Sequence, residues 1–259
     1  MRLRGGQWAW TTALVLGLAA AGCRSPGAAS RPAGTLAIGL ATNAPPFAFR
    51  KGWRTWTGLD VDLGRALAEK LNMRPRFVPL KPDEAIPALL DGRVDVLMGG
   101  LAVTDERRTQ IEFSSPYLVT GLGFLIRETD RPRYTTAVRI QAMPTRVAVI
   151  AHSPAEDLLA RYFPRARPFP VPDLQTGAEA LRRSRVDLVA GEAPALWWLA
   201  RTLPRGMAMA PPLFARREIA WGFRQGSMRL RRDANDTLAE WTRDGTLESI
   251  LRRWVPVSP

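Results

Sequence analysis

One stretch of sequence occurs twice in this chain, as ALLDGRVDV at residues 88–96 and as ALRRSRVDL at residues 180–188. Each copy has the pattern of a helix end followed by a buried strand, and each strand runs on to glycine, at Gly99 and Gly100 in the first copy and Gly191 in the second. Ligands of open α/β sheets bind at the carboxyl ends of the strands. The repeat therefore predicts two lobes of like construction, with both glycine ends at a shared cleft.

Apolar patterns on either side of each copy alternate between strand and helix. In the first half, strands are predicted at residues 36–40, 76–80 and 94–98, with a helix capped by Asp60 and another at 83–91. In the second half, strands are predicted at 147–150, 168–171 and 186–190, and helices at 154–162, 176–183 and 193–202. A last amphipathic helix runs from Leu247 to Trp254. This alternation predicts an α/β fold in which each lobe is a mostly parallel sheet flanked by helices.

Charge and composition exclude several functions. The 259 residues suffice for two modest cores, and the 37 basic residues outnumber the 24 acidic ones. No basic stripe interleaved with aromatic residues stands out, so we expect no nucleic-acid partner. Metal-ligand clusters, phosphate-binding loops and catalytic triads are not found in the sequence. We therefore predict a monomeric binding protein without cofactor, metal site or catalytic residue, and not an enzyme.

The first 34 residues predict export. Arg2 and Arg4 precede an uncharged run that ends in small residues before Cys23. The apolar core, residues 8–21, is shorter than the roughly 20 residues that cross a membrane. We predict a cleaved signal peptide at 1–22 and, from the Ser, Pro, Gly and Ala content, a flexible tether at 23–34. Cys23 is the only cysteine, so the chain forms no internal disulfide.

The segment Leu18–Cys23 resembles the lipobox of bacterial lipoproteins, except that Ala20 stands where leucine is usual. The resemblance implies that Cys23 is acylated and becomes the mature N-terminus. The protein is then exported to the periplasm or cell surface, and its lipid anchors it to a membrane.

Several strings in the folded part occur in the order and spacing of one family. They lie at residues 58–71, 86–96, 104–117 and 244–254, beginning with the string GLDVDL. Together they resemble the bacterial extracellular solute-binding family of polar amino acid ABC importers, typified by glutamine-, histidine- and arginine-binding proteins. The resemblance implies a periplasmic-binding-protein, or Venus-flytrap, fold and an ABC permease as partner. Lobe 1 is then 35–118 plus 220–259 and lobe 2 is 119–219, with hinge crossings near 117–121 and 215–219.

The resemblance also implies a ligand site, which the residue chemistry supports in part. The planar guanidinium of Arg107 suits a carboxylate, and Gly100 allows the backbone to approach the ligand closely. Glu192 stands where the family places the aspartate that binds the ammonium group. The predicted ligand-binding residues are Arg107, Gly100, Ala102, Glu192, Ser153, His152 and Phe47.

Other family positions have changed in this chain. Ala102 replaces a hydroxyl, Ala44 and Pro82 replace aromatic residues, and Pro154, in the loop that follows the first strand of lobe 2, has no backbone N–H to donate. We therefore expect standard α-amino acids to bind weakly. The tryptophan pair at 197–198 is expected to be buried by helix packing.

Three functions remain open. The first is capture of a small polar, carboxylate-bearing or otherwise anionic solute for an ABC importer by closure of the two lobes. The second is a sensory or cell-wall-associated binding module without a permease, which the changed pocket favours. The third is an enzyme similar to cyclohexadienyl dehydratases, for which Glu192 is the one acid or base candidate. Neighbouring permease and ATPase genes would favour the first function, and turnover of prephenate-like acids the third.

The lipid anchor can be tested at Cys23. We expect Cys23→Ser to release soluble protein or to leave an uncleaved precursor, because serine offers no thiol for acylation. Membrane fractionation and the mass of the mature N-terminus measure both outcomes. Unchanged processing and membrane extraction in that variant would refute the anchor.

Overall fold

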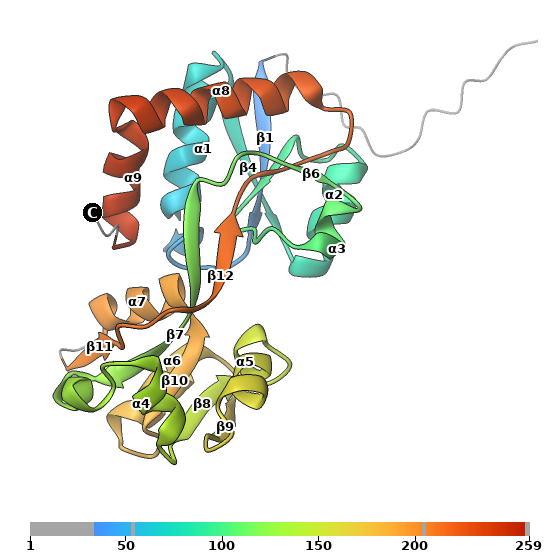
Figure 1. Cartoon of the computed structure of the whole chain (residues 1–259). Helices are drawn as coiled ribbons and strands as arrows, with labels where there is room; N and C mark the ends of the chain where they lie inside the picture. The colour runs from blue at the N-terminus through green and yellow to red at the C-terminus, as the bar shows by residue number, and fades with distance from the viewer. Residues whose placement is uncertain (1–33, 53–54, 204–205, 257–259) are drawn as a thin grey trace, which may run out of the picture.

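The chain folds into two α/β lobes joined by two strands. The structure is a computed structural model that describes residues 34–52, 55–203 and 206–256, so the leader, Cys23 and most of the tether lie outside the described residues. Two antiparallel neighbours, β7 (Leu118–Arg127) and β12 (Phe214–Ile219), run between the lobes (Figure 1). Among the described residues, no helix is long and apolar enough to cross a membrane.

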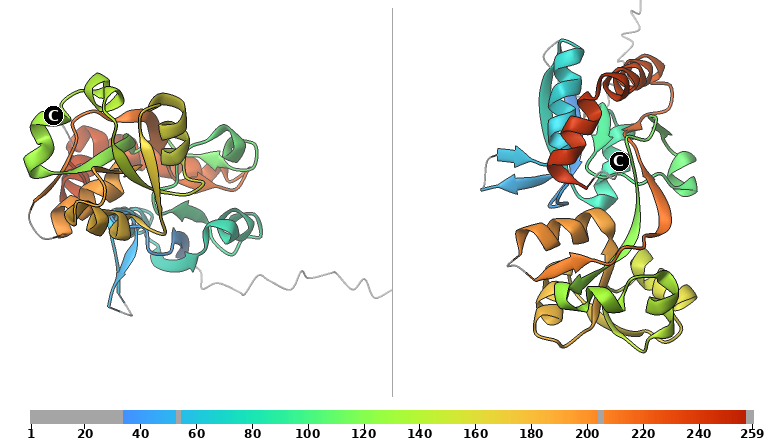
Figure 2. Two further views of the ribbon diagram at one scale, coloured as in Figure 1. Left: turned by 90° about the horizontal axis from the view of Figure 1, so that it is seen from below. Right: turned by 60° about the vertical axis from the view of Figure 1, so that its left-hand side comes forward.

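Lobe 1 is built on a five-stranded sheet of order β4-β1-β5-β13-β6. The strands β1 (Thr35–Ala41), β4 (Arg74–Leu80) and β5 (Val96–Met98) are parallel, and β13 (Gly222–Phe223) is antiparallel to β5 and to β6 (Glu112–Phe113). The helices of this lobe are α1 (Leu59–Lys70), α2 (Pro82–Leu90), α3 (Asp105–Arg108), α8 (Met228–Asp244) and α9 (Thr246–Trp254). A hairpin of β2 (Phe49–Lys51) and β3 (Thr55–Thr57) projects from the lobe (Figure 2).

Lobe 2 repeats the plan around the path β11-β7-β10-β8-β9. The strands β8 (Arg146–Ile150), β9 (Arg167–Val171) and β10 (Leu188–Glu192) are parallel, whereas β7, β11 (Met207–Met209) and β12 pair antiparallel. The helical segments are η1 (Glu128–Arg133), α4 (Ala137–Ala142), α5 (Pro154–Tyr162), α6 (Leu174–Arg182) and α7 (Ala193–Thr202). Both sheets are therefore mixed, with the predicted parallel order confined to three strands in each lobe.

The repeated sequence forms the same helix-to-strand corner in both lobes. The carbonyl of Ala88 accepts a hydrogen bond from the amide of Arg93, and that of Ala180 accepts one from Arg185, each at 2.9 Å. Each repeated aspartate then binds the neighbouring parallel strand of its own lobe: the amide of Ala37 in β1 donates to Asp95 Oδ2 and the amide of Arg146 in β8 to Asp187 Oδ2, both at 2.8 Å.

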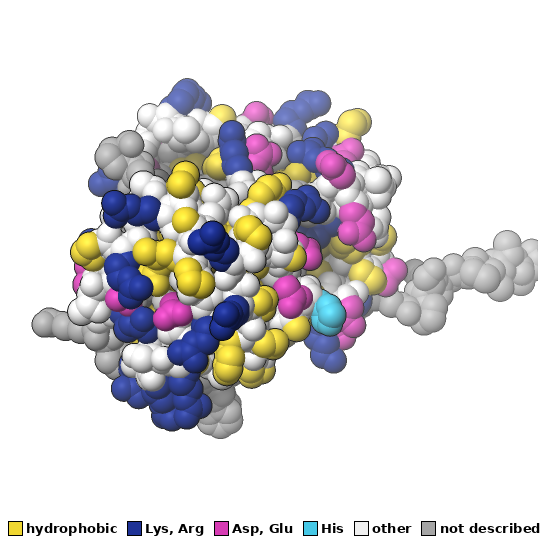
Figure 3. All heavy atoms as spheres, turned by 60° about the horizontal axis from the view of Figure 1, so that its bottom comes forward, with side chains coloured by type: hydrophobic (Ala, Val, Ile, Leu, Met, Phe, Trp, Pro, Cys, Tyr) yellow, Lys and Arg dark blue, Asp and Glu magenta, His cyan; other side chains and the backbone are white. Residues whose placement is uncertain are grey.

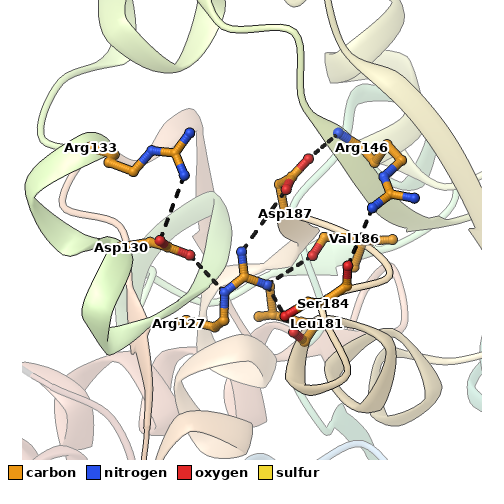
Figure 4. A network of polar contacts seen from close by, with 8 residues as sticks. All are labelled: Arg127, Asp130, Arg133, Arg146, Leu181, Ser184, Val186 and Asp187. Atoms are coloured by element: carbon orange, nitrogen blue, oxygen red, sulfur yellow. Dashed lines mark hydrogen bonds and ion pairs between the residues drawn. The ribbon is translucent and has the colours of Figure 1, made fainter.

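A guanidinium reinforces the corner in lobe 2. Arg127 donates to the carbonyls of Leu181 and Val186 at 2.9 and 3.0 Å, and its Nε lies 2.7 Å from Asp130 Oδ2 (Figure 4). These contacts assign the repeated aspartates a structural role.

Two features differ from the sequence-based expectations. Asp60 does not cap α1, since the N-cap is Gly58 and Asp60 lies inside the first turn, fully buried. Helix α8 was not anticipated from the sequence. Its exposed face is strongly charged, and its buried residues, Ala234, Thr237, Leu238 and Trp241, include polar and small side chains that weaken the apolar pattern.

Asp60 joins three parts of lobe 1 through one oxygen. Its Oδ2 accepts from the amides of Gly99 at 2.7 Å and Gly100 at 2.6 Å, and from the hydroxyl of Tyr117 at 2.8 Å. The start of α1, the glycine end of β5 and the residue that leads into β7 are thereby held together. Burial raises the pKa of Asp60 to about 6, although the hydrogen bonds from Tyr117, Gly100 and Gly99 act in the opposite direction.

The raised pKa makes stability depend on pH. Asp60 has a pKa of about 6 in the folded state and 3.8 in the unfolded state, so the folded state binds the proton more tightly. The resulting stabilisation of the folded state is fully present below pH 3.8 and is lost as the pH rises through 6. We expect the wild type to lose about 3 kcal/mol of unfolding free energy relative to Asp60→Asn between about pH 3 and pH 7.

Urea unfolding of both proteins across this range measures the difference. Asp91→Asn, which removes an exposed carboxylate at the end of α2, serves as the matched control and should follow the wild type. Parallel pH profiles for the wild type and Asp60→Asn would contradict the assignment.

Candidate functional site

A cavity of about 380 Å³ lies between the lobes, at the ends of the strands that run toward the cleft. Lobe 1, lobe 2 and both connecting strands all contribute to its wall. Its lining residues are Phe47, Gly100, Ala102, Thr104 and Arg107 from lobe 1, Thr120, Arg217 and Ile219 from the connecting strands, and Pro154, Glu192 and Pro194 from lobe 2. A volume of this order suits a small solute.

The loop held by Asp60 forms one wall of the cavity. Gly100 has φ +78°, in the left-handed region, and a Cβ built there would lie 2.5 Å from the Phe47 ring. Glycine is thus required for both the backbone conformation and the approach of the ring. Phe47 is itself nearly buried, at 9% exposure.

Arg107 is positioned by the short helix α3. The hydroxyl of Thr104 accepts from the Arg107 amide at 3.3 Å, and Arg107 Nη1 donates to the carbonyl of Ala102 at 2.8 Å. Burial lowers the pKa of Arg107, the charge of Glu106 raises it, and the nearby charge of Arg217 lowers it again. Within the described part of the chain, Arg107 has no ion-pair partner, so its guanidinium retains donors for an anion.

A second cation and an acid complete the polar part of the cavity. Arg217 Nε lies 3.4 Å from Glu192 Oε1, within ion-pair distance but without the geometry of a hydrogen bond. Glu192 ends β10 and precedes α7, which places it at the carboxyl end of the repeated strand. Burial raises the pKa of Glu192, and the positive charge of Arg217 opposes that effect.

The cavity brings together most of the residues that the sequence predicts. Phe47, Gly100, Ala102, Arg107 and Glu192 all line it. The structure does not place Ser153 and His152 there. Their role in binding therefore stays a prediction, and the geometry offers it no support.

Ser153 and His152 have local structural roles instead. The Ser153 hydroxyl caps α5 by accepting from the Glu156 amide at 3.3 Å, and it lies beside a separate cavity of about 90 Å³. The His152 side chain is exposed (Figure 3). The amide of His152 donates to Glu156 Oε2 at 2.7 Å. Pro154, from the same loop, does line the main cavity. On the face in Figure 3, basic side chains are dispersed among acidic and apolar ones.

Sequence reasoning missed Arg217 and Thr120 as cavity residues. They face each other across the β7–β12 pair, within the segments expected to cross between the lobes. The ladder shifts register between Phe214 and Arg217, and Ala215 adopts φ +47°. Such a bulge redirects the side chains that follow it, so simple alternation along the strand cannot assign them to a face.

Aromatic residues also connect the two lobes. Trp198 on α7 lies 5.0 Å from Phe49 and 5.9 Å from Trp254 between ring centroids, and Phe49 lies 6.0 Å from Trp254. Neither Trp198 nor Trp197 is buried, so the expectation of burial was wrong. Their helix face meets the other lobe across the cleft rather than a core. No group of His, Cys, Asp and Glu side chains within the described ranges could hold a metal ion.

Two lobes that are joined by a pair of crossing strands and enclose a cavity with a few charged side chains define the class of two-lobed solute-binding proteins. The chain belongs to the bacterial extracellular solute-binding proteins, family 3, whose model matches residues 36–257. This membership agrees with the fold described above and with a solute-binding role.

Known proteins of this kind are similar over most of the chain. The L-cystine-binding protein TcyJ of Escherichia coli K12 is 28% identical over 221 residues, covering 85% of this chain and 82% of its own. A solved ancestral cationic amino acid solute-binding protein superposes with a TM-score of 0.80 at 26% identity, covering 86% of this chain and 96% of its own. The cyclohexadienyl dehydratase of Pseudomonas aeruginosa is 27% identical over 161 residues, or 62% of this chain and 60% of its own.

Proposed function

We propose that this protein is exported, anchored to a membrane through lipidated Cys23, and captures a small carboxylate-bearing solute for an ABC importer. Family membership and the L-cystine-binding relative support capture and transport of an amino-acid-like solute. The leader and the lone cysteine support the anchor. A permease that recognises the closed lobes would be its partner.

The guanidinium of Arg107 is the single observation that carries the proposal. It lines the cavity between the lobes, bonds to one backbone carbonyl and has no acid beside it within ion-pair distance among the described residues. A partly buried cation without a counter-ion is costly unless an anion joins it. A carboxylate accepts hydrogen bonds from a guanidinium in a planar, bidentate arrangement. The ligand therefore places a carboxylate or similar anion against Arg107.

Closure of the lobes follows from where the cavity residues originate. Arg107 belongs to lobe 1 and Glu192 to lobe 2, so a solute that contacts both stabilises the form in which the lobes approach. The aromatic cluster of Phe49, Trp198 and Trp254 supports a closed form, because its rings touch across the lobes. Ligand binding then shifts the population toward that form.

Arg107 provides the test of this function. A thermal-shift screen of the protein against amino acids, small peptides and dicarboxylates identifies a ligand, because binding to the folded state raises the melting temperature. We expect Arg107→Ala to weaken that ligand by roughly thirtyfold or more in calorimetry, since removing one partner of a buried charge pair costs about 2–5 kcal/mol.

Arg108→Ala is the matched control, because Arg108 follows in the same helix with an exposed side chain outside this cavity. It should bind the ligand like the wild type. Normal binding by Arg107→Ala would remove the carboxylate assignment.

A second candidate function is a dehydratase of the cyclohexadienyl type. Glu192 is the one acid among the residues that line the cavity, and burial raises its pKa, which is the direction that a general acid requires. The similar dehydratase of Pseudomonas aeruginosa shows that a relative has this activity.

Incubation with prephenate tests this candidate directly. Release of carbon dioxide and water by the wild type, lost in Glu192→Gln, would establish the enzyme. We expect no turnover from either protein, because no second acid or base from the described residues lines the cavity beside Glu192.

A further inference from the structure

Arg217 lies on the strand that returns from lobe 2 to lobe 1 and reaches the same cavity as Arg107. It follows the register shift in β12, opposite Thr120 on β7, and its side chain is 22% exposed. Its Nε is buried and has no hydrogen-bond acceptor within the described chain, although Glu192 Oε1 is 3.4 Å away. A buried guanidinium nitrogen without an acceptor is rare unless a ligand supplies one.

Positive charges outnumber negative charges among the side chains that line the cavity. Arg107 and Arg217 are both cationic, and Glu192 is the single acid among the lining residues. Glu192 lies beside Arg217, so its charge is already balanced within the protein. One positive charge, on Arg107, is left for the ligand, and Arg217 retains unused N–H donors.

This balance is unfavourable for a zwitterionic amino acid. Its carboxylate would pair with Arg107, but its ammonium group would need Glu192 and would then lie close to the guanidinium of Arg217. Like charges at such a distance repel. An acid without an ammonium group avoids this conflict and can accept hydrogen bonds from both arginines.

We propose that Arg217 holds Glu192 and provides a second anion-binding group, so that the cleft selects carboxylic acids without an α-ammonium group over the corresponding amino acids. This inference rests on the proposed function, because it uses Arg107 as the primary carboxylate site. It narrows the ligand class to small organic acids of net negative charge, with dicarboxylates favoured since they reach both guanidinium groups.

Matched pairs of ligands test the proposal. Calorimetry of the full-length protein in detergent compares glutarate with L-glutamate and valerate with L-norvaline, since the members of each pair differ only in the ammonium group. We expect each acid to bind the wild type roughly tenfold or more tightly than its amino counterpart, with glutarate the tightest. In Arg217→Gln the acids weaken and the amino acids strengthen by similar factors, because Glu192 becomes free for the ammonium group.

Two further variants keep the test specific. Arg217→Lys preserves the charge and should retain the wild-type order, whereas Arg216→Gln changes a neighbouring side chain that is 74% exposed and should have no effect. Thermal unfolding confirms that each variant is folded.

Tighter binding of an amino acid than of its matched acid by the wild type would overturn the proposal, as would unchanged ratios in Arg217→Gln. Failure of all four compounds to bind would also overturn it. The carboxylate site at Arg107 would survive the first two results if Arg107→Ala still weakened the ligand. The failure of this inference is therefore distinguishable from failure of the proposed function.

Discussion

The hydrogen bonds to Asp60 Oδ2 are the constraint on which the site depends. One buried oxygen receives the amides of Gly99 and Gly100 and the hydroxyl of Tyr117, and so fixes the end of β5 relative to α1 and to the entry of β7. Gly100 in turn forms the wall against Phe47, and β7 carries the chain into the second lobe. A carboxylate that is otherwise costly to bury is retained because these donors hold the cavity wall and the crossing strand in register.

Much of the fold could be predicted because the two lobes use the same local signals. The repeated corner, with its positive φ at Gly92 and Ser184, is encoded within a few residues. The hydrogen bonds of its aspartates instead reach parallel strands that lie 58 and 41 residues away in the sequence. The antiparallel strands were harder to predict, since β7 and β12 are defined by pairing between distant segments and not by a local period. The prediction that Asp60 caps α1 was wrong for a related reason. An acid near the start of a helix commonly caps it, but the Asp60 carboxylate instead accepts hydrogen bonds from donors that are distant in the sequence.

The residues of the candidate cavity could be predicted where the family resemblance and a strand end coincide, and could not be predicted where the geometry depends on a bulge. The family resemblance, together with positions after the glycine ends of β5 and β10, pointed to Arg107, Gly100 and Glu192, and all three line the cavity. The side chain of Arg217 reaches the cavity because of the register shift in β12, and hydrophobic periodicity in the sequence does not predict such a shift. The loop of His152 and Ser153 occupies the expected stretch of sequence, but the cap on α5 uses the hydroxyl of Ser153 and leaves Pro154 as the residue facing the cavity.

The central claim is that a carboxylate is bound between the lobes by Arg107, with the connecting strand supplying the neighbouring cation. The most direct measurement is a crystal structure of the protein grown with glutarate. The account predicts one carboxylate within hydrogen-bond distance of the Arg107 guanidinium and contacts to the ligand from Arg217 and from lobe 2. A second cavity, lined by Arg108, Arg216 and Arg217 among others, lies nearby. A ligand bound there without contact to Arg107, or one held by lobe 1 alone, would contradict the account.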